Sequence, residues 1–236
     1  MISNWVLTRA QPDADSDVAA MKARGLRAIA VPCIERVALP WPSTSPQLIF
    51  ITSPYAATQL IEAWPSLPEP KPRVAAMAPI TSARLRAHGV PTEVRAEGGV
   101  VALASALQRW NAGKPLTVLY ATSDLGILQS EQEEAMKVMK SFATVDRVPV
   151  YSTRAPVGLD ETLGALEPGL GYVFMSPSAV ENALGAFARL GRTLFANAVA
   201  CIGQSTQRRY RELAVHPAPA HHASFTAFLQ SLSGDA

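Results

Sequence analysis

The sequence predicts an α/β protein with two similar domains, each built on a parallel sheet that helices cover on both faces. Two observations lead to this prediction. Strand-like apolar runs alternate with helix-like patterns along most of the 236 residues, which is typical of parallel sheets. In addition, one strand-to-helix arrangement occurs twice, at 48–57 and at 172–180, and such a repeat indicates an internal duplication.

The composition fits this class and excludes several others. Hydrophobic residues make up 48% of the chain and charged residues 17%, which suits a globular protein with one large core or two smaller ones. The net charge of +2 is too small for a face that binds nucleic acid. No apolar run approaches the length of a membrane span, and the first residues do not form a signal peptide. We therefore expect a soluble, cytoplasmic protein that binds neither nucleic acid nor membranes.

The first 46 residues contain one strand–helix–strand unit and a linker. A short apolar run at 5–8 predicts a strand, and the acids after Pro12 open a helix that Gly25 ends. A second strand is expected at 28–31. Prolines at 40, 42 and 46 then interrupt all periodicity, which predicts a linker.

The middle of the chain alternates regularly between strands and helices. Strands are predicted at 48–52, 73–77, 93–96 and 116–121, and helices at 54–64, 79–88, 99–111 and 124–140. The next segment, 144–153, is extended and is soon followed by Pro156, so we interpret it as a second linker.

The last third of the chain resumes the alternation. Helices are predicted at 160–166, 177–190, 204–213 and 224–232, and strands at 171–175, 198–202 and 214–217. Neither this block nor the first 32 residues forms a complete domain, but together they match the middle block.

These patterns predict two domains, one of which is discontinuous. The discontinuous domain comprises 1–36 and 152–236, and the inserted domain comprises 37–151. Extended crossings near 33–38 and 147–155 would join them as a two-stranded linker. Because ligands of open parallel sheets bind beyond the C-terminal ends of the strands, we expect a ligand-binding cleft between the two domains.

Each half also carries hydroxyl groups at the starts of two helices. Ser53 and Ser176 are natural N-caps, because the Pro after each one fits the first helical position. The next strand in each half leads, at nearly the same spacing, to Thr81 and Thr206. Helix N-termini present free N–H groups and partial positive charge, so these four positions predict a site for an anionic ligand.

Five motifs, taken in order along the chain, resemble those of the uroporphyrinogen-III synthase family. They are 6–9 with 12–14, 50–56, 150–153, 174–180 and 200–206. Each motif alone is common, whereas their order and spacing agree over essentially the whole chain. The resemblance implies two flavodoxin-like domains joined by a two-stranded linker, with the active-site cleft between them and with neither metal nor cofactor.

The resemblance also implies a reaction, that of a lyase of heme and other tetrapyrrole biosynthesis. Hydroxymethylbilane, a linear tetrapyrrole, would lose water and close into uroporphyrinogen III with its ring D inverted. The family's favoured catalytic tyrosine falls on Tyr151, and Thr206 is the second catalytic candidate. The residues expected to bind substrate are Arg9, Thr52, Ser53, Tyr55, Thr81, Ser176, Ser178 and Ser205. The resemblance further implies a monomer, with transient contact to the upstream hydroxymethylbilane synthase.

Two departures from the family pattern keep other functions open. Ala78 stands where the family usually has Gly, and the turn at 120–124 replaces one that contains Gly and Arg. A non-catalytic module that binds a tetrapyrrole or another anion is therefore the alternative to the enzyme. A small-anion binding protein of the hinged two-lobe type is a second alternative, although such proteins usually carry export signals.

Other polar clusters have plainer interpretations. His216, His221 and His222 are expected in a solvated Pro/Ala-rich loop, because no acid or Cys stands at metal-ligand spacing. The acidic run 131–134 is expected to be a surface face of a helix. Cys33 and Cys201 lie in apolar runs and are expected to be buried thiols. The arginines at 208, 209 and 211 are left open between carboxylate contacts and a solvated face.

Overall fold

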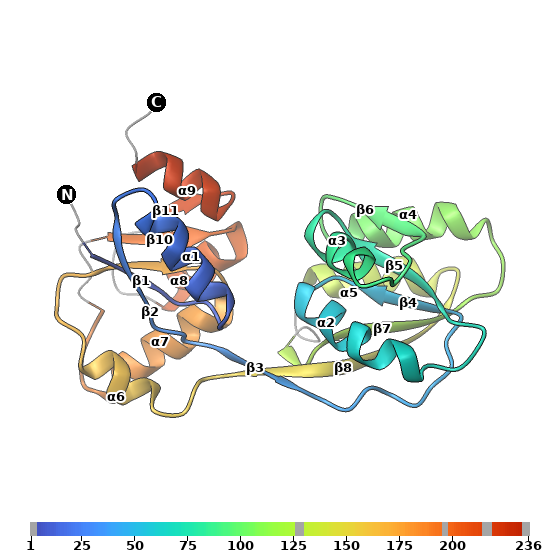
Figure 1. Ribbon diagram of the computed structural model, residues 1–236, viewed down its shortest axis with the longest axis horizontal. Coiled ribbons are helices and arrows are strands. Elements are labelled where there is room, and N and C mark those ends of the chain that lie inside the picture. The colour runs from blue at the N-terminus through green and yellow to red at the C-terminus, as the bar shows by residue number, and fades with distance from the viewer. Residues whose placement is uncertain (1–3, 126–129, 195–197, 214–218, 233–236) are drawn as a thin grey trace. The chain divides into compact units, whose positions relative to one another are not determined.

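The computed structural model describes residues 4–125, 130–194, 198–213 and 219–232. The chain forms two compact units (Figure 1). Unit 1 comprises Met1–Arg36 and Arg154–Ala236, and unit 2 comprises Val37–Thr153. Each unit has its own largely parallel sheet and its own helices, so the predicted α/β class is confirmed.

Unit 1 contains a five-stranded sheet with the order β11-β10-β9-β1-β2. Its strands are β1 (Asn4–Leu7), β2 (Arg27–Ala30), β9 (Gly171–Phe174), β10 (Ala198–Ile202) and β11 (Ala220–His222). Its helices are α1 (Asp13–Lys22), α6 (Leu159–Gly164), α7 (Pro177–Arg189), α8 (Gln204–Leu213) and α9 (Phe225–Leu232). Neighbouring strands are parallel throughout, so their C-terminal ends lie along one edge of the sheet.

The sheet of unit 1 separates two apolar cores, because side chains of a strand alternate between its faces. Trp5 and Leu7 of β1 pack with α1 and α9 on one face. Val6 and Phe174 pack with α6, α7 and α8 on the other face. The unit is therefore a three-layer arrangement, with the sheet in the middle.

Unit 2 contains a six-stranded sheet with the order β3-β8-β7-β4-β5-β6. Its strands are β3 (Glu35–Ala38), β4 (Leu48–Ile51), β5 (Arg73–Met77), β6 (Val94–Ala96), β7 (Thr117–Ser123) and β8 (Thr144–Arg154). Its helices are α2 (Pro54–Ala63), α3 (Ile80–Ala87), α4 (Val100–Asn111) and α5 (Ser130–Lys140), with a short 3₁₀ helix at Trp64–Ser66.

The sheet of unit 2 also lies between two cores. Ile49 and Ile51 of β4 pack with α2 and α3, whereas Leu48 and Phe50 pack with α4 and α5. All four of these side chains are fully buried. The continuous apolar run at 48–51 is therefore explained, because a central strand of a parallel sheet is covered on both faces.

The interpretation of 144–153 as a linker was wrong. This segment belongs to β8, which pairs with β7 from Thr117↔Thr144 to Ser123↔Tyr151. Pro149 suggested a break in the structure, yet it lies beside the irregularity between Thr122 and Ser123, and a bulge is where a sheet tolerates Pro. The segment is therefore a strand of the sheet, and the chain leaves unit 2 only after Thr153.

The expected loop around the histidines was also wrong in part. His221 and His222 belong to β11, which pairs with β10 through Cys201↔His221 and Ile202↔His222. The strand predicted at 214–217 and His216 lie outside the described residues. The last strand of unit 1 is thus short and follows Pro219, where sequence patterns carry little strand signal.

No helix in the described ranges is long and apolar enough to cross a membrane. In the same ranges no group of three or more His, Cys, Asp or Glu side chains could hold a metal ion.

Candidate functional site

Both repeated Ser-Pro motifs begin helices as predicted. The Ser53 Oγ accepts a hydrogen bond from the Ala56 N–H at 3.0 Å, and the Ser176 Oγ accepts one from the Ala179 N–H at 3.2 Å. In each case Pro occupies the first helical position, where its missing N–H costs nothing. The predicted N-caps are therefore confirmed in both units.

In unit 2, three of the predicted binding residues follow the C-terminal ends of two neighbouring strands. Thr52 and Ser53 follow β4, and Thr81 follows β5. Because β4 and β5 are parallel, these residues share one edge of the sheet. Thr81 is the second residue of α3 and is buried, whereas Thr52 and Ser53 are half-buried.

Tyr151 reaches the same edge from β8. Its hydroxyl donates a hydrogen bond to the Ser53 Oγ at 3.1 Å, although the two residues are far apart in sequence. The Tyr151 side chain is largely buried, and its ring packs edge-on against Tyr55 with the ring centroids 5.0 Å apart. The structure therefore brings together three of the predicted site residues, Tyr151, Ser53 and Tyr55.

The contacts of Ser53 fix the direction of its own proton. The Ser53 Oγ accepts from the Ala56 N–H and from the Tyr151 hydroxyl. A serine oxygen has two lone pairs and one O–H donor, so both lone pairs are in use. The hydroxyl proton must then point toward a third group, and Ser53 is prepared to donate to an acceptor at this edge.

The unusual turn at 120–124 is built from a polar network. The Thr122 hydroxyl donates to the Gln132 Oε1 at 3.2 Å, and Arg147 donates to the same oxygen at 2.8 Å. Arg147 also pairs with Glu133 at 2.9 Å. This network joins β7 and β8 to α5, so the residues of the acidic run do more than form a solvated face.

Tyr120 and Asp124 complete this turn, and sequence reasoning gave neither a role. Tyr120 is fully buried, and burial raises its pKa, although the nearby Thr52 hydroxyl and Arg147 guanidinium oppose that shift. The Asp124 carboxylate accepts from the Leu125 N–H at 2.8 Å and from the Thr153 N–H at 3.1 Å. These bonds tie the end of β7 to the end of β8, close to Tyr151.

In unit 1, the other predicted hydroxyl groups follow β9 and β10. The Ser176 and Ser178 hydroxyls lie 3.2 Å apart. Thr206 lies in the first turn of α8 and is buried, whereas its neighbour Ser205 is exposed. Since β9 and β10 are parallel, these residues share the C-terminal edge of this sheet.

Arg9 lies in an ion-pair network rather than alone at this edge. Its guanidinium pairs with Asp13 at 3.1 Å and with Asp17 at 3.2 Å, and Arg36 pairs with Asp13 at 3.0 Å. Burial raises the pKa of Asp17, and the charge of Arg9 opposes that shift. The network holds the start of α1 against the end of β1. Sequence reasoning did not foresee this role of Arg9.

The two thiols of the chain are inactive by burial. Cys33 and Cys201 are fully buried, and burial raises the pKa of each thiol to about 12. Because the thiolate is the reactive form, neither cysteine serves as a nucleophile at neutral pH. Hydroxyl groups are therefore the chemically useful side chains at both edges.

Comparisons with known proteins identify a family and a fold. A family model described as Uroporphyrinogen-III synthase HemD matches residues 15–230. A crystal structure of uroporphyrinogen-III synthetase from Helicobacter pylori is similar with a TM-score of 0.63 and 14% identity, covering 98% of this chain and 99% of that chain.

A second solved structure leads to the same fold. It is a mutant uroporphyrinogen III synthase from the extremely thermophilic bacterium Thermus thermophilus, similar with a TM-score of 0.57 and 15% identity over 97% of each chain. No curated protein sequence matches this chain. At these identities the two structures show the fold alone, and the family rests on the family model.

Proposed function

Because this chain belongs to the uroporphyrinogen-III synthase family, we propose that it converts hydroxymethylbilane to uroporphyrinogen III. In this reaction the terminal hydroxyl leaves as water, and the macrocycle closes with ring D inverted. The observation that carries the proposal is the contact between Tyr151 and Ser53 at the C-terminal edge of unit 2.

The chemistry needs a proton at the departing hydroxyl. A pyrrole nitrogen supplies the electrons that break the C–O bond, and a proton on that oxygen makes water the leaving group. The Tyr151 phenol donates to Ser53, whose own O–H is then available to donate to a further acceptor. This pair therefore suits a hydrogen-bond relay to the departing hydroxyl, which is general acid catalysis by a positioned side chain.

The harder task is the choice between two ring closures. A hundredfold preference for the inverted product needs only about 2.7 kcal/mol between the competing transition states. Shape and hydrogen bonds suffice for a difference of this size, without a covalent nucleophile. This fits a site whose two cysteines are buried and protonated.

Binding of the substrate rests on the helix starts. Hydroxymethylbilane carries many carboxylates, and a helix N-terminus contributes roughly 0.3–1 kcal/mol toward an anion. The starts of α2 and α7 present Ser53 and Ser176. We assign the substrate contacts to these two residues together with Thr52, Tyr55, Thr81, Ser178 and Ser205, with Thr206 as the second proposed catalytic hydroxyl.

The deciding experiment identifies the product isomer. Purified protein is supplied with hydroxymethylbilane, and the oxidised products are separated by chromatography. Isomer III above the level of a heat-denatured control supports the enzyme. Isomer I alone, the product of unassisted closure, would instead support a non-catalytic module that binds a tetrapyrrole or another anion.

We further propose a cytoplasmic monomer that acts on this small molecule without a cofactor. Light scattering on the eluting protein tests the monomer, and activity measured before and after exhaustive dialysis against a chelator tests the absence of a metal cofactor. A dimer as the only active species, or activity lost with the chelator and restored by a metal, contradicts them.

A further inference from the structure

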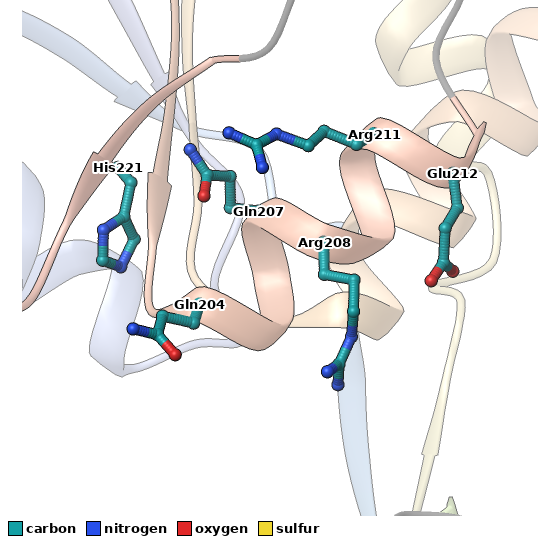
Figure 2. Close-up of a pocket in the computed structure, with 6 residues that line it drawn as sticks. All are labelled: Gln204, Gln207, Arg208, Arg211, Glu212 and His221. Atoms are coloured by element: carbon teal, nitrogen blue, oxygen red, sulfur yellow. The ribbon is translucent and has the colours of Figure 1, made fainter.

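A hollow of about 490 Å³ lies beside α8 in unit 1 (Figure 2). Its lining residues are Gln204, Gln207, Arg208, Arg211 and Glu212 of α8 and His221 of β11. Gln204, Gln207 and Arg211 stand at helical spacing and share one side of α8, and Arg208 and Glu212, four residues apart, share another. The buried Thr206 and Tyr210 lie on the face of the helix that packs into the unit, and of the lining residues Gln207 donates a hydrogen bond to the Pro219 carbonyl at 3.0 Å.

The charges of α8 are distributed unevenly. Arg209 pairs with Glu181 at 2.7 Å and with Glu212 at 2.9 Å, so the carboxylate that lines the hollow already has a cation. Arg208 and Arg211 form no ion pair within the described ranges of the chain. The hollow thus presents two guanidinium groups that pair with no carboxylate among the described residues.

The hollow opens at the edge where the substrate is proposed to bind. Gln204 begins α8 directly after β10, and the Gly203 N–H donates to the His222 carbonyl at 2.9 Å. His221 is the register partner of Cys201, and these two residues are the last but one in β11 and β10. The exposed Ser205 follows Gln204 in the first turn of α8, at the same edge of the sheet as the hydroxyl groups after β9.

The two arginines project in different directions. Figure 2 shows Gln204, Gln207 and Arg211 on the side of α8 that faces His221, whereas Arg208 and Glu212 project from another side. One small anion would not engage both guanidinium groups fully. Two carboxylates carried on separate arms of a larger molecule fit this arrangement better, since each guanidinium can then take one carboxylate in a bidentate pair.

We propose that this hollow binds two carboxylate side chains of the tetrapyrrole, one at Arg211 with His221 and the other at Arg208. The inference rests on the proposed function and adds a binding subsite to it. We expect this contact, which is remote from the reacting atoms, to be equally strong in the ground state and the transition state, so that its loss raises KM and leaves kcat unchanged.

The test compares charge-removing variants on α8 with a matched control. The variants are Arg208→Gln, Arg211→Gln and the double variant, and the control is Arg24→Gln. Arg24 is an exposed arginine of unit 1 whose guanidinium, among the described residues, donates to the Ala20 carbonyl and forms no ion pair. The double variant should raise KM for hydroxymethylbilane about tenfold with kcat within about twofold, because uniform binding is lost. Arg24→Gln should change neither constant.

A variant that removes a negative charge from the hollow should change KM in the opposite direction. Glu212→Gln removes the one carboxylate that lines the hollow and should lower KM. An unchanged KM in the double variant, or an equal rise in Arg24→Gln, overturns the subsite. Thermal melting followed by circular dichroism confirms that each variant is folded before its kinetics are compared.

A binding measurement separates failure of the subsite from failure of the proposed function. Uroporphyrin III has the same carboxylate side chains and needs no turnover, and its fluorescence reports binding. Weaker binding by the double variant supports the subsite even if wild type makes no isomer III. Equal binding by both proteins overturns it. If inorganic phosphate binds wild type but not the double variant while uroporphyrin III binds both equally, the hollow takes a free oxyanion instead.

Discussion

At the residue scale, the contact between Tyr151 and Ser53 depends on the order of three strands. β8 and β4 lie on either side of β7, so the Tyr151 side chain crosses the end of β7 to reach Ser53. The irregularity between Thr122 and Ser123 shifts the register of β8 at this point. Side chains of a regular strand alternate between the two faces of the sheet. Without the shift of one residue, the side chain at position 151 would therefore lie on the other face.

Replacing Tyr151 by Phe should lower turnover by about one to two orders of magnitude, because the positioned proton donor is lost while binding and shape remain. The ring stays and keeps its contact with Tyr55, so the melting temperature should change little. Steady-state kinetics with hydroxymethylbilane measure the effect. A variant with wild-type kinetics would remove Tyr151 from the catalytic residues.

Replacing Ser53 by Ala should have two effects, since this side chain both caps α2 and accepts from Tyr151. The lost cap should cost about 1 kcal/mol in the free energy of unfolding, and turnover should fall by roughly tenfold or more. Urea titration and kinetics measure the two effects separately.

Ser224→Ala is the matched control for this variant. The Ser224 Oγ caps α9 by accepting from the Ala227 N–H at 3.1 Å, and it has no part in the proposed site. It should lose a similar stability and keep its turnover. Equal losses of turnover in both variants would mean that helix capping, rather than the relay, explains the effect.

The free energy of unfolding should decrease in mild acid because of His222. Burial, followed by the charge of His221, lowers the pKa of His222, so the unfolded chain binds this proton more tightly than the folded one. This contribution to the free energy of unfolding is fully present above the pKa of His222 in the unfolded chain, about 6.5. It is lost as the pH falls from there through the lower pKa of the folded state. Urea titrations at two pH values on either side measure this loss, which should be smaller in His222→Gln. An equal loss in both proteins contradicts the assignment.

The site could be predicted from sequence only where its signal is local. Ser53 and Ser176 were identified because Ser-Pro is a helix-start signal that needs no tertiary contact. The bond from Tyr151 to Ser53 depends on register across three strands, and no local pattern encodes it. The ion pairs of Arg9 with Asp13 and Asp17 were missed for the same reason, since an arginine near a strand end does not reveal its partner.

At the element scale, the pairing of β1 with β9 depends on one glycine. Gly171 is the register partner of Trp5, and a Cβ at Gly171 would lie 2.6 Å from the Trp5 Cε3. The indole occupies the space that a side chain would need. The indole of Trp5 also packs edge-on against Phe228, with the ring centroids 5.1 Å apart, so it cannot move without disturbing the core beneath α9.

Gly171→Ala should therefore destabilise unit 1 by about 1–3 kcal/mol, as overpacking does in a dense core. The loss should be smaller in a Trp5→Leu background, so the two substitutions should not be additive. Gly164→Ala is the control, because its Cβ would meet Leu190 at an ordinary 3.5 Å. Additive losses in the double-mutant cycle would show that Trp5 is not the cause.

Strands with ordinary patterns were predicted and irregular ones were not. The continuous apolar runs of β4 and β9 predict buried central strands, and both strands are confirmed. β8 was missed because Pro149 resembles a break, and β11 because its three residues carry no apolar alternation. A strand whose existence depends on its neighbour, rather than on its own sequence, is beyond prediction from local pattern.

At the scale of the whole molecule, the two units differ in how their chain is arranged. Unit 2 is one continuous segment with both of its cores complete. Unit 1 needs two segments, because β1 from the first lies between β9 and β2 in its sheet. The extra strand β3 in unit 2 was not foreseen.

A fragment of residues 35–154 should therefore fold alone, since it contains β3 to β8 and all four helices of unit 2. It should unfold cooperatively in urea, as small single domains do. A fragment of residues 154–236 lacks β1 and β2 and should show no cooperative transition. Circular dichroism on both fragments checks this, and a cooperative transition in the second fragment would contradict it.

The burial of Cys33 and Cys201 has a practical consequence. Maleimide dyes react with thiolates, so wild type should remain unlabelled without removal of either native cysteine. New cysteines at exposed positions, such as Lys114→Cys in unit 2 and Glu167→Cys in unit 1, would then carry a donor and an acceptor fluorophore. Energy transfer between such a pair would report, in solution and molecule by molecule, how the two halves of the chain respond when the tetrapyrrole is added.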